Sequence, residues 1–222
     1  MNIKKSFPIV LLPVMFMLTV PSSAQRYKTY YLELGILGGG SYYLGDVNNT
    51  LLNNMLTTAG AFFKYRFNNR WELKFQVSGG QTGIAVFDES MRRTTFVDGA
   101  VIGEFNFFNY GATPFNPHTY NITPYIFAGL GFSTFHLDVG GVVPFGVGVK
   151  WRIAQRFNLG AYWSSQKVIW NDNFDGIDNP LGLNQGGWNN TDWYSTVAMY
   201  FSVDLWERCA PCAGPPKHVY NR

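Results

Sequence analysis

Apolar and charged side chains alternate along residues 62–80, FFKYRFNNRWELKFQVSGG, on both sides of a two-asparagine tip. An alternation with a period of two predicts β-strands, and a short polar tip between two of them predicts a β-hairpin. One side of this hairpin carries Lys64, Arg66, Glu72 and Lys74. Whether that side faces bulk water or a closed interior therefore decides what kind of protein this chain can be.

The same alternation recurs along most of the chain. It predicts eight strands, at residues 30–42, 58–67, 70–83, 95–107, 123–136, 142–153, 157–170 and 192–206. Strands of about ten residues or slightly more are long enough to cross a bilayer when they are tilted. We therefore predict an all-β fold, an eight-stranded antiparallel transmembrane β-barrel of the outer-membrane type over residues 25–206.

Composition indicates which face of the barrel is outside. Charged residues make up 14% of the chain, against roughly 25% in an ordinary soluble domain, and a soluble barrel needs polar groups over its whole exterior. Aromatic residues also pair near strand ends, as Phe67 with Trp71, Phe107 with Tyr125, and Trp151 with Phe157. Such pairs are typical of the aromatic girdle at a membrane interface. We expect the apolar faces to contact lipid; a soluble barrel or sandwich is the alternative.

If lipid lies outside, the charged faces must line the lumen. An eight-stranded barrel is just wide enough for side chains to fill its interior, and an unpaired buried charge costs several kcal/mol. We therefore expect one network of ion pairs, formed by Glu33, Lys64, Arg66, Glu72, Lys74, Glu104, Lys150 and Arg152. A lumen filled in this way argues against a conducting pore.

The first 24 residues are typical of a signal peptide. A basic start is followed by an apolar stretch at residues 7–20, and Ser22-Ser23-Ala24 predicts cleavage between Ala24 and Gln25. Export predicts a location in the outer membrane, with both ends of the barrel in the periplasm. Residues 207–222 would then be a periplasmic tail, in which Cys209 and Cys212 could form a disulfide; redox catalysis is the alternative.

The lengths of the predicted connections set the orientation of the barrel. The turns at 68–69 and 153–157 are short, which is typical of periplasmic turns, whereas 43–57, 84–94 and 171–191 are longer and are expected outside. The connection 137–141 is short for the outer side.

The connection 108–122 is long for the periplasmic side. Its central residues are a candidate docking segment for a periplasmic partner: Pro114, Phe115, Asn116, Pro117 and His118. The alternative is an irregular, solvent-exposed turn without a binding role.

Other functions have weaker support in the sequence. The net charge of +3, without a basic run, argues against nucleic acid. Acidic residues in 171–191 invite a calcium interpretation, but the last ligand position of an EF-hand loop would fall on Gly182 instead of Glu. The histidines are scattered, and only His136 has a nearby serine, Ser133. We expect no catalytic residue, metal, cofactor or small-molecule substrate.

Seven segments in order carry a family resemblance: ELGILGGGSYYLGD (33–46), KYRFNNRWELK (64–74), IGEFNFF (102–108), TPYIFAGLGFSTF (123–135), VPFGVGVKWRI (143–153), FDGIDNP (174–180) and WYSTVAMYFSVDL (193–205). Together they resemble the PorG-like (DUF6089-like) outer-membrane barrel proteins of the type IX secretion system. The resemblance implies a non-enzymatic barrel that anchors secretion or gliding machinery, in contact with a periplasmic ring lipoprotein and its partner subunit.

One segment departs from that family. The connection between PYIFAGLG and PFGVGVK is only a few residues long here, where the family has a longer insertion. A divergent relative with another partner is therefore an open alternative. A further alternative is a surface adhesion or ligand-binding barrel that acts through its outer loops, with Trp188 and residues 171–191 as the binding segment.

Overall fold

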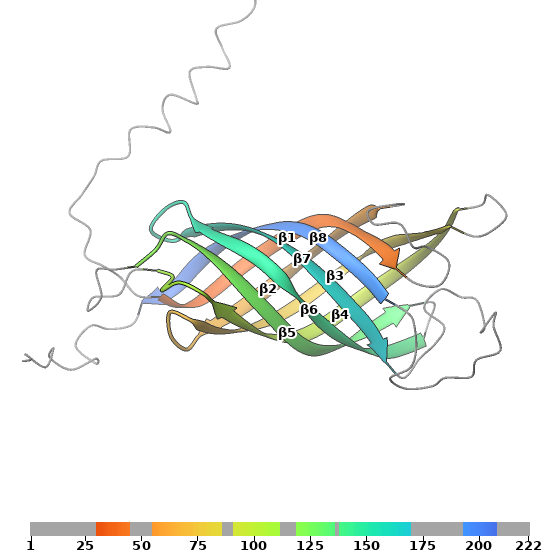
Figure 1. Cartoon of the computed structure of the whole chain (residues 1–222), viewed down its shortest axis with the longest axis horizontal. Helices are drawn as coiled ribbons and strands as arrows, with labels where there is room; N and C mark the ends of the chain where they lie inside the picture. The colour runs from red at the N-terminus through yellow and green to blue at the C-terminus, as the bar shows by residue number, and fades with distance from the viewer. Residues whose placement is uncertain are drawn as a thin grey trace, which may run out of the picture.

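The chain folds into one closed β-barrel. The computed structural model describes residues 30–44, 55–85, 91–111, 119–135, 138–169 and 193–207. Each strand pairs antiparallel with the next, and β8 pairs with β1 to close the sheet (Figure 1). The strands are β1 (Tyr30–Leu44), β2 (Leu56–Arg66), β3 (Trp71–Ala85), β4 (Met91–Asn106), β5 (Ile122–Phe135), β6 (Asp138–Arg152), β7 (Phe157–Ile169) and β8 (Trp193–Glu207). The predicted eight-stranded antiparallel barrel is confirmed.

The strands extend further than the sequence pattern predicted. Most of the predicted connection 84–94 is strand, because β3 continues to Ala85 and β4 begins at Met91. The predicted connection 137–141 is also mostly strand, since β6 begins at Asp138. Glycines and charged residues there weaken the alternation, but the adjacent strand supplies hydrogen-bond partners for their backbone groups, and such context overrides local preference.

Both ends of the barrel's chain lie on the same side. Tyr30 at the start of β1 pairs with Glu207 at the end of β8. The turns at 67–70 and 153–156 lie at this same end, at the left of Figure 1. We call it the terminal end, and the opposite end the far end. Within the described ranges, no helix is long and apolar enough to cross a membrane.

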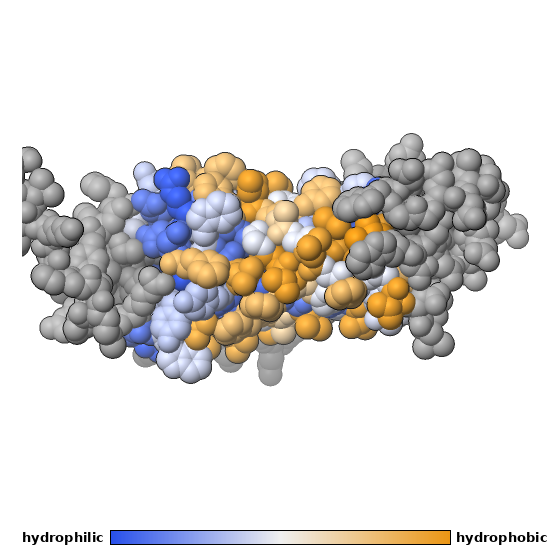
Figure 2. Space-filling view, turned by 90° about the horizontal axis from the view of Figure 1, so that it is seen from below, coloured by the Kyte–Doolittle hydropathy of each residue, from blue (hydrophilic) through white to orange (hydrophobic). Residues whose placement is uncertain are grey.

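The exterior of the barrel is apolar and its interior is polar and aromatic. On β3, Phe75 and Val77 are exposed, whereas Glu72 and Lys74 are about 2% exposed. Figure 2 shows an apolar band across the visible face, with hydrophilic residues gathered toward the terminal end. The predicted assignment of faces therefore holds on this strand, and the burial pattern of the other strands follows the same alternation.

The predicted aromatic girdle is present at the terminal end with one exception. Five of its members are exposed: Phe67, Trp71, Phe107, Trp151 and Phe157. Tyr125 was placed wrongly, since it is 1% exposed and lies in the lumen. It pairs with the inward-facing Asn106 of β4, so the alternation of β5 turns its ring inward even though it lies near the end of the strand.

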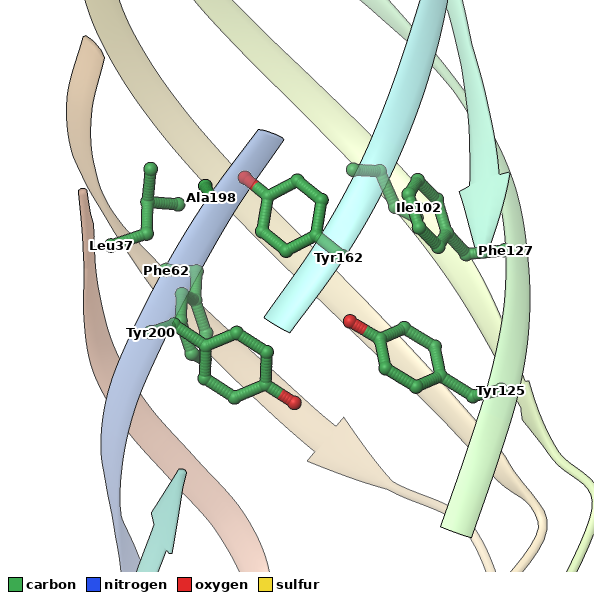
Figure 3. Packing of buried hydrophobic residues seen from close by; sticks show 8 residues of the cluster. All are labelled: Leu37, Phe62, Ile102, Tyr125, Phe127, Tyr162, Ala198 and Tyr200. Atoms are coloured by element: carbon green, nitrogen blue, oxygen red, sulfur yellow. The ribbon is translucent and has the colours of Figure 1, made fainter. Parts of the chain in front are cut away.

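Rings fill the middle of the lumen. Figure 3 shows this cluster, which consists of Leu37, Phe62, Ile102, Tyr125, Phe127, Tyr162, Ala198 and Tyr200. Glycines on the lumen face give the rings room: a Cβ on Gly160 would lie 2.3 Å from the ring of Tyr200, and one on Gly148 would lie 2.6 Å from the ring of Tyr125. A second cluster, nearer the far end, consists of Tyr43, Phe96, Phe135, Val142, Val168 and Tyr194.

Candidate functional site: the lumen charge network and the terminal end

Glu104 of β4 is the centre of a network of ion pairs in the terminal half of the lumen. Its carboxylate, which is fully buried, lies 2.6 Å from Nζ of Lys150, 2.9 Å from Nζ of Lys74 and 3.3 Å from Nζ of Lys64. Lys150 also reaches Glu72, at 2.5 Å. Three lysines from three strands therefore share one carboxylate.

Arg66 of β2 connects the remaining carboxylates. Its guanidinium lies 3.0 Å from Glu72, 3.2 Å from Glu33 and 3.7 Å from Asp204. Arg152 of β6 also pairs with Asp204, at 2.8 Å. The structure thus brings together all eight residues of the predicted network and adds Asp204 of β8, which the prediction did not include.

The network combines ion pairs between neighbouring strands, such as Arg66 with Glu72, with pairs between strands that are not neighbours, such as Lys150 with Glu72. Lys64 lies opposite Lys74 on the neighbouring strand, and Glu72 lies opposite Glu104. Like charges in such positions destabilise a sheet. Lys150 resolves the conflict, because its ammonium group comes from β6 across the lumen and lies between the two carboxylates.

The aromatic cluster covers the network on its inner side. Nζ of Lys150 lies 4.5 Å from the ring centre of Tyr125, and Nζ of Lys64 lies 4.6 Å from that of Tyr200. Nζ of Lys74 lies 5.1 Å from the rings of both Phe127 and Tyr162. Rings at these distances stabilise ammonium groups that have lost water, so network and cluster form one unit.

Tyr110 closes the terminal end of the lumen. It belongs to the connection after β4, is 1% exposed, and lies 5.7 Å and 5.2 Å from the guanidinium carbons of Arg66 and Arg152. Burial raises the pKa of Tyr110, so its hydroxyl stays protonated and donates a 2.7 Å hydrogen bond to Asn158. The next residue, Gly111, has a φ of 89°, which a glycine adopts without strain.

Removing only the Tyr110 hydroxyl should weaken this closure. We expect Tyr110→Phe to lower the free energy of unfolding by about 1 kcal/mol, because Asn158 loses a buried hydrogen bond while the ring keeps its place. Urea unfolding in lipid vesicles measures the change. Tyr120→Phe is the matched control: Tyr120 is 55% exposed, so its substitution should leave the free energy of unfolding unchanged. Equal effects of the two variants would show that Tyr110 does not close the lumen.

Several predicted site residues cannot be placed. These lie outside the described residues: Ala24, Gln25, Pro114, Phe115, Asn116, Pro117, His118, His136, Trp188, Cys209 and Cys212. The only flanks of the docking segment that the structure describes are residues 107–111 and 119–121. Ser133 faces the lumen and is fully buried, whereas its neighbour Thr134 is exposed outside, so the two cannot act at one site.

A closed eight-stranded antiparallel barrel with an apolar exterior and a lumen of paired charges defines a small barrel of the outer-membrane type. The family described as "Domain of unknown function (DUF6089)" matches residues 9–213, and the chain belongs to this family. This family membership is the part of the resemblance that is confirmed; the connection to type IX secretion stays a prediction. No curated protein matches the sequence.

Solved outer-membrane proteins resemble this barrel to different degrees. Neisserial surface protein A matches with a TM-score of 0.54 at 8% identity, over 78% of this chain and 97% of that one. The N-terminal barrel domain of Pseudomonas aeruginosa OprF matches with a TM-score of 0.42 at 14% identity, over 79% of this chain and 98% of that one. The attachment invasion locus protein Ail of Yersinia pestis matches with a TM-score of 0.46 at 13% identity, over 80% of this chain and 100% of that one. At such identities, the first of these likenesses shows a common fold and nothing finer.

Proposed function

We propose that this protein is a non-enzymatic outer-membrane barrel that docks a periplasmic complex of the protein-secretion machinery at its terminal end. The observation that carries the proposal is the filled lumen. Ion pairs and rings occupy its interior, and Tyr110 covers them at the terminal end. A barrel whose interior is occupied by its own side chains acts through its surfaces, and an anchor needs only a stable surface that faces the partner.

The terminal end offers such a surface. The backbone N–H of Asn106 donates to the carbonyl of Arg70 at 2.7 Å, and that of Tyr110 donates to the carbonyl of Asn69 at 3.3 Å. The side chain of Arg70 donates to Asn109 at 3.3 Å. These bonds join the turn at 67–70 to the start of the long connection, so the flank of the predicted docking segment at residues 107–111 is held against the barrel.

The identity of the partner rests on the family resemblance in the sequence. It implies a periplasmic ring lipoprotein and its partner subunit, as found with PorG-like barrels of the type IX secretion system. The signal-peptide pattern and the lengths of the predicted connections support a barrel in the outer membrane after removal of residues 1–24, with its terminal end in the periplasm. A terminal end in the periplasm would bring residues 112–118 and the tail within reach of such a ring.

Co-purification with the ring subunits tests this function. Residues 112–118 are replaced by a Gly/Ser segment of equal length, which keeps Tyr110 and Tyr120 in place, and a second variant ends after Glu207, which keeps its ion pair with Arg156. We expect the combined variant to lose the ring subunits while the barrel still reaches the outer membrane.

Replacement of residues 86–90, which follow β3 and precede β4 in the sequence, is the matched control and should leave co-purification unchanged. Normal co-purification of the combined terminal-end variant would reject the proposal. If loss of residues 171–191 abolished surface binding while secretion continued, the adhesion alternative would replace it.

A further inference from the structure

A second polar site lies in the far half of the lumen, apart from the charge network. Asp98 of β4 is 4% exposed, and neither of its carboxylate oxygens makes a hydrogen bond to any described residue. It forms no ion pair within the described part of the chain. A bare buried carboxylate costs several kcal/mol, so something must compensate its charge.

The charge network is too far away to do so. Asp98 lies four residues beyond Ile102, the cross-strand partner of Lys74, which corresponds to about 13 Å along a strand. The rings of Phe127 and Tyr162 contact Lys74 on one side and line the space beside Asp98 on the other. Aromatic rings therefore separate this carboxylate from the nearest cation of the network.

Asp98 borders a small internal cavity whose walls combine polar and apolar side chains. The cavity has a volume of about 10 Å³ and is lined by Gln76, Ser78, Asp98, Ala100, Ile102, Phe127, Pro144, Tyr162, Ser164 and Gln166. This volume suits one water molecule or one small ion. The polar lining comes from β3, β4 and β7, so the closed barrel is needed to assemble it.

The lining presents oxygen atoms that lack donors. The amide of Gln76 donates to Ser78 at 3.3 Å, which leaves its Oε1 without a hydrogen bond to any described residue. The hydroxyls of Ser133 and Tyr194 also lie near the carboxylate, but neither makes a hydrogen bond of good geometry to it, and that of Tyr194 donates to Gln166 at 2.7 Å. A carboxylate, an amide oxygen and hydroxyl oxygens around a cavity of this size are the ligand set of a hard cation.

We propose that this cavity binds one monovalent cation of the size of sodium, with Asp98 as the charged ligand and Gln76 as a neutral one. A divalent ion fits poorly, because no group of three or more His, Cys, Asp or Glu side chains gathers anywhere in the described ranges. The cation supplies the charge that Asp98 lacks. The site is independent of docking at the terminal end.

Refolding in defined salts tests the site. The wild type and Asp98→Asn are refolded from urea into detergent in sodium chloride or choline chloride, exchanged into choline buffer, and analysed for bound sodium and for melting temperature. We expect the sodium-refolded wild type to retain one sodium ion per chain and to melt about 3 °C or more above the choline-refolded protein. Asp98→Asn should retain none and melt at the same temperature in both salts.

Two further variants make the result decisive. Glu207→Gln removes a carboxylate at the barrel surface and should keep the sodium of the wild type. If Asp98→Asn fails to fold, Gln76→Leu keeps the carboxylate, removes the amide oxygen, and should lower sodium retention. A wild type that retains no sodium and melts identically in both salts overturns the proposal, and a proton or a water then compensates Asp98.

Discussion

Glu104→Gln should lower the free energy of unfolding by about 3–5 kcal/mol, because it leaves buried lysines without their shared carboxylate. Lys64, Lys74 and Lys150 all lie within 3.3 Å of Glu104. Lys64 and Lys150 keep other carboxylates, whereas Lys74 has no second ion pair within the described residues. Urea unfolding in lipid vesicles should show a lower midpoint with an unchanged slope.

The position of the charge, and not its mere removal, should decide this effect. Glu207→Gln breaks the exposed pair with Arg156 at the barrel end and should cost at most about 1 kcal/mol. Adding Lys74→Met to Glu104→Gln removes the stranded cation and should recover part of the loss. If Glu104→Gln were as mild as Glu207→Gln, the ion pairs of the lumen would not be a buried network.

Val77→Arg should lower the free energy of unfolding by about 2–4 kcal/mol in vesicles, because it places a charge in the apolar middle of the bilayer. Val77 lies near the middle of β3 and is 61% exposed on the outer face. Its cross-strand neighbours are Ala61 and Gly99, which offer no polar partner for an arginine. The same urea titration measures the loss.

Depth in the membrane provides the control for this prediction. Ile122→Arg changes a residue of similar exposure, 53%, at the terminal edge of β5. There the arginine reaches the headgroups, and the cost should fall to about 0–1 kcal/mol. Equal costs at both positions, or a Val77→Arg barrel as stable as the wild type, would contradict a lipid-facing exterior.

The sequence predicted the number of strands and both of their faces, because side chains in a strand alternate strictly between two sides. Lys74 and Phe75 could be assigned to opposite faces from this alternation alone. The ends of the strands were less predictable, as the extension of β6 back to Asp138 shows. Backbone pairing decides those ends, and it depends on the neighbouring strand more than on the residues themselves.

Contacts across the lumen could not be predicted from the pattern. Lys150 contacts Glu72, which lies 78 positions earlier in the sequence, and Glu104, which lies 46 positions earlier. Which side chains meet depends on the tilt and stagger of the strands in the closed barrel, and alternation does not encode either. The same limit explains why Asp204 was missed as a member of the network.

Asp98 and Glu104 show how much depends on that geometry. Both are acidic residues on the inner face of β4. Glu104 lies opposite Glu72 and within reach of three lysines, whereas Asp98 lies between Ser78 and Ser133 on the adjacent strands. Two residues of the same chemical kind on one strand therefore have different roles, an ion-pair centre and an isolated carboxylate.

A labelling experiment along β3 tests the orientation of the barrel wall most directly. Cys209 and Cys212, the two cysteines of the chain, are replaced by serine, and single cysteines are placed at Phe75, Gln76, Val77 and Ser78 for spin labels in lipid vesicles. We predict that labels at 75 and 77 are accessible to oxygen dissolved in the bilayer, and that labels at 76 and 78 are not. Accessibility of 76 and 78 to a water-soluble reagent, with 75 and 77 protected, would contradict the account.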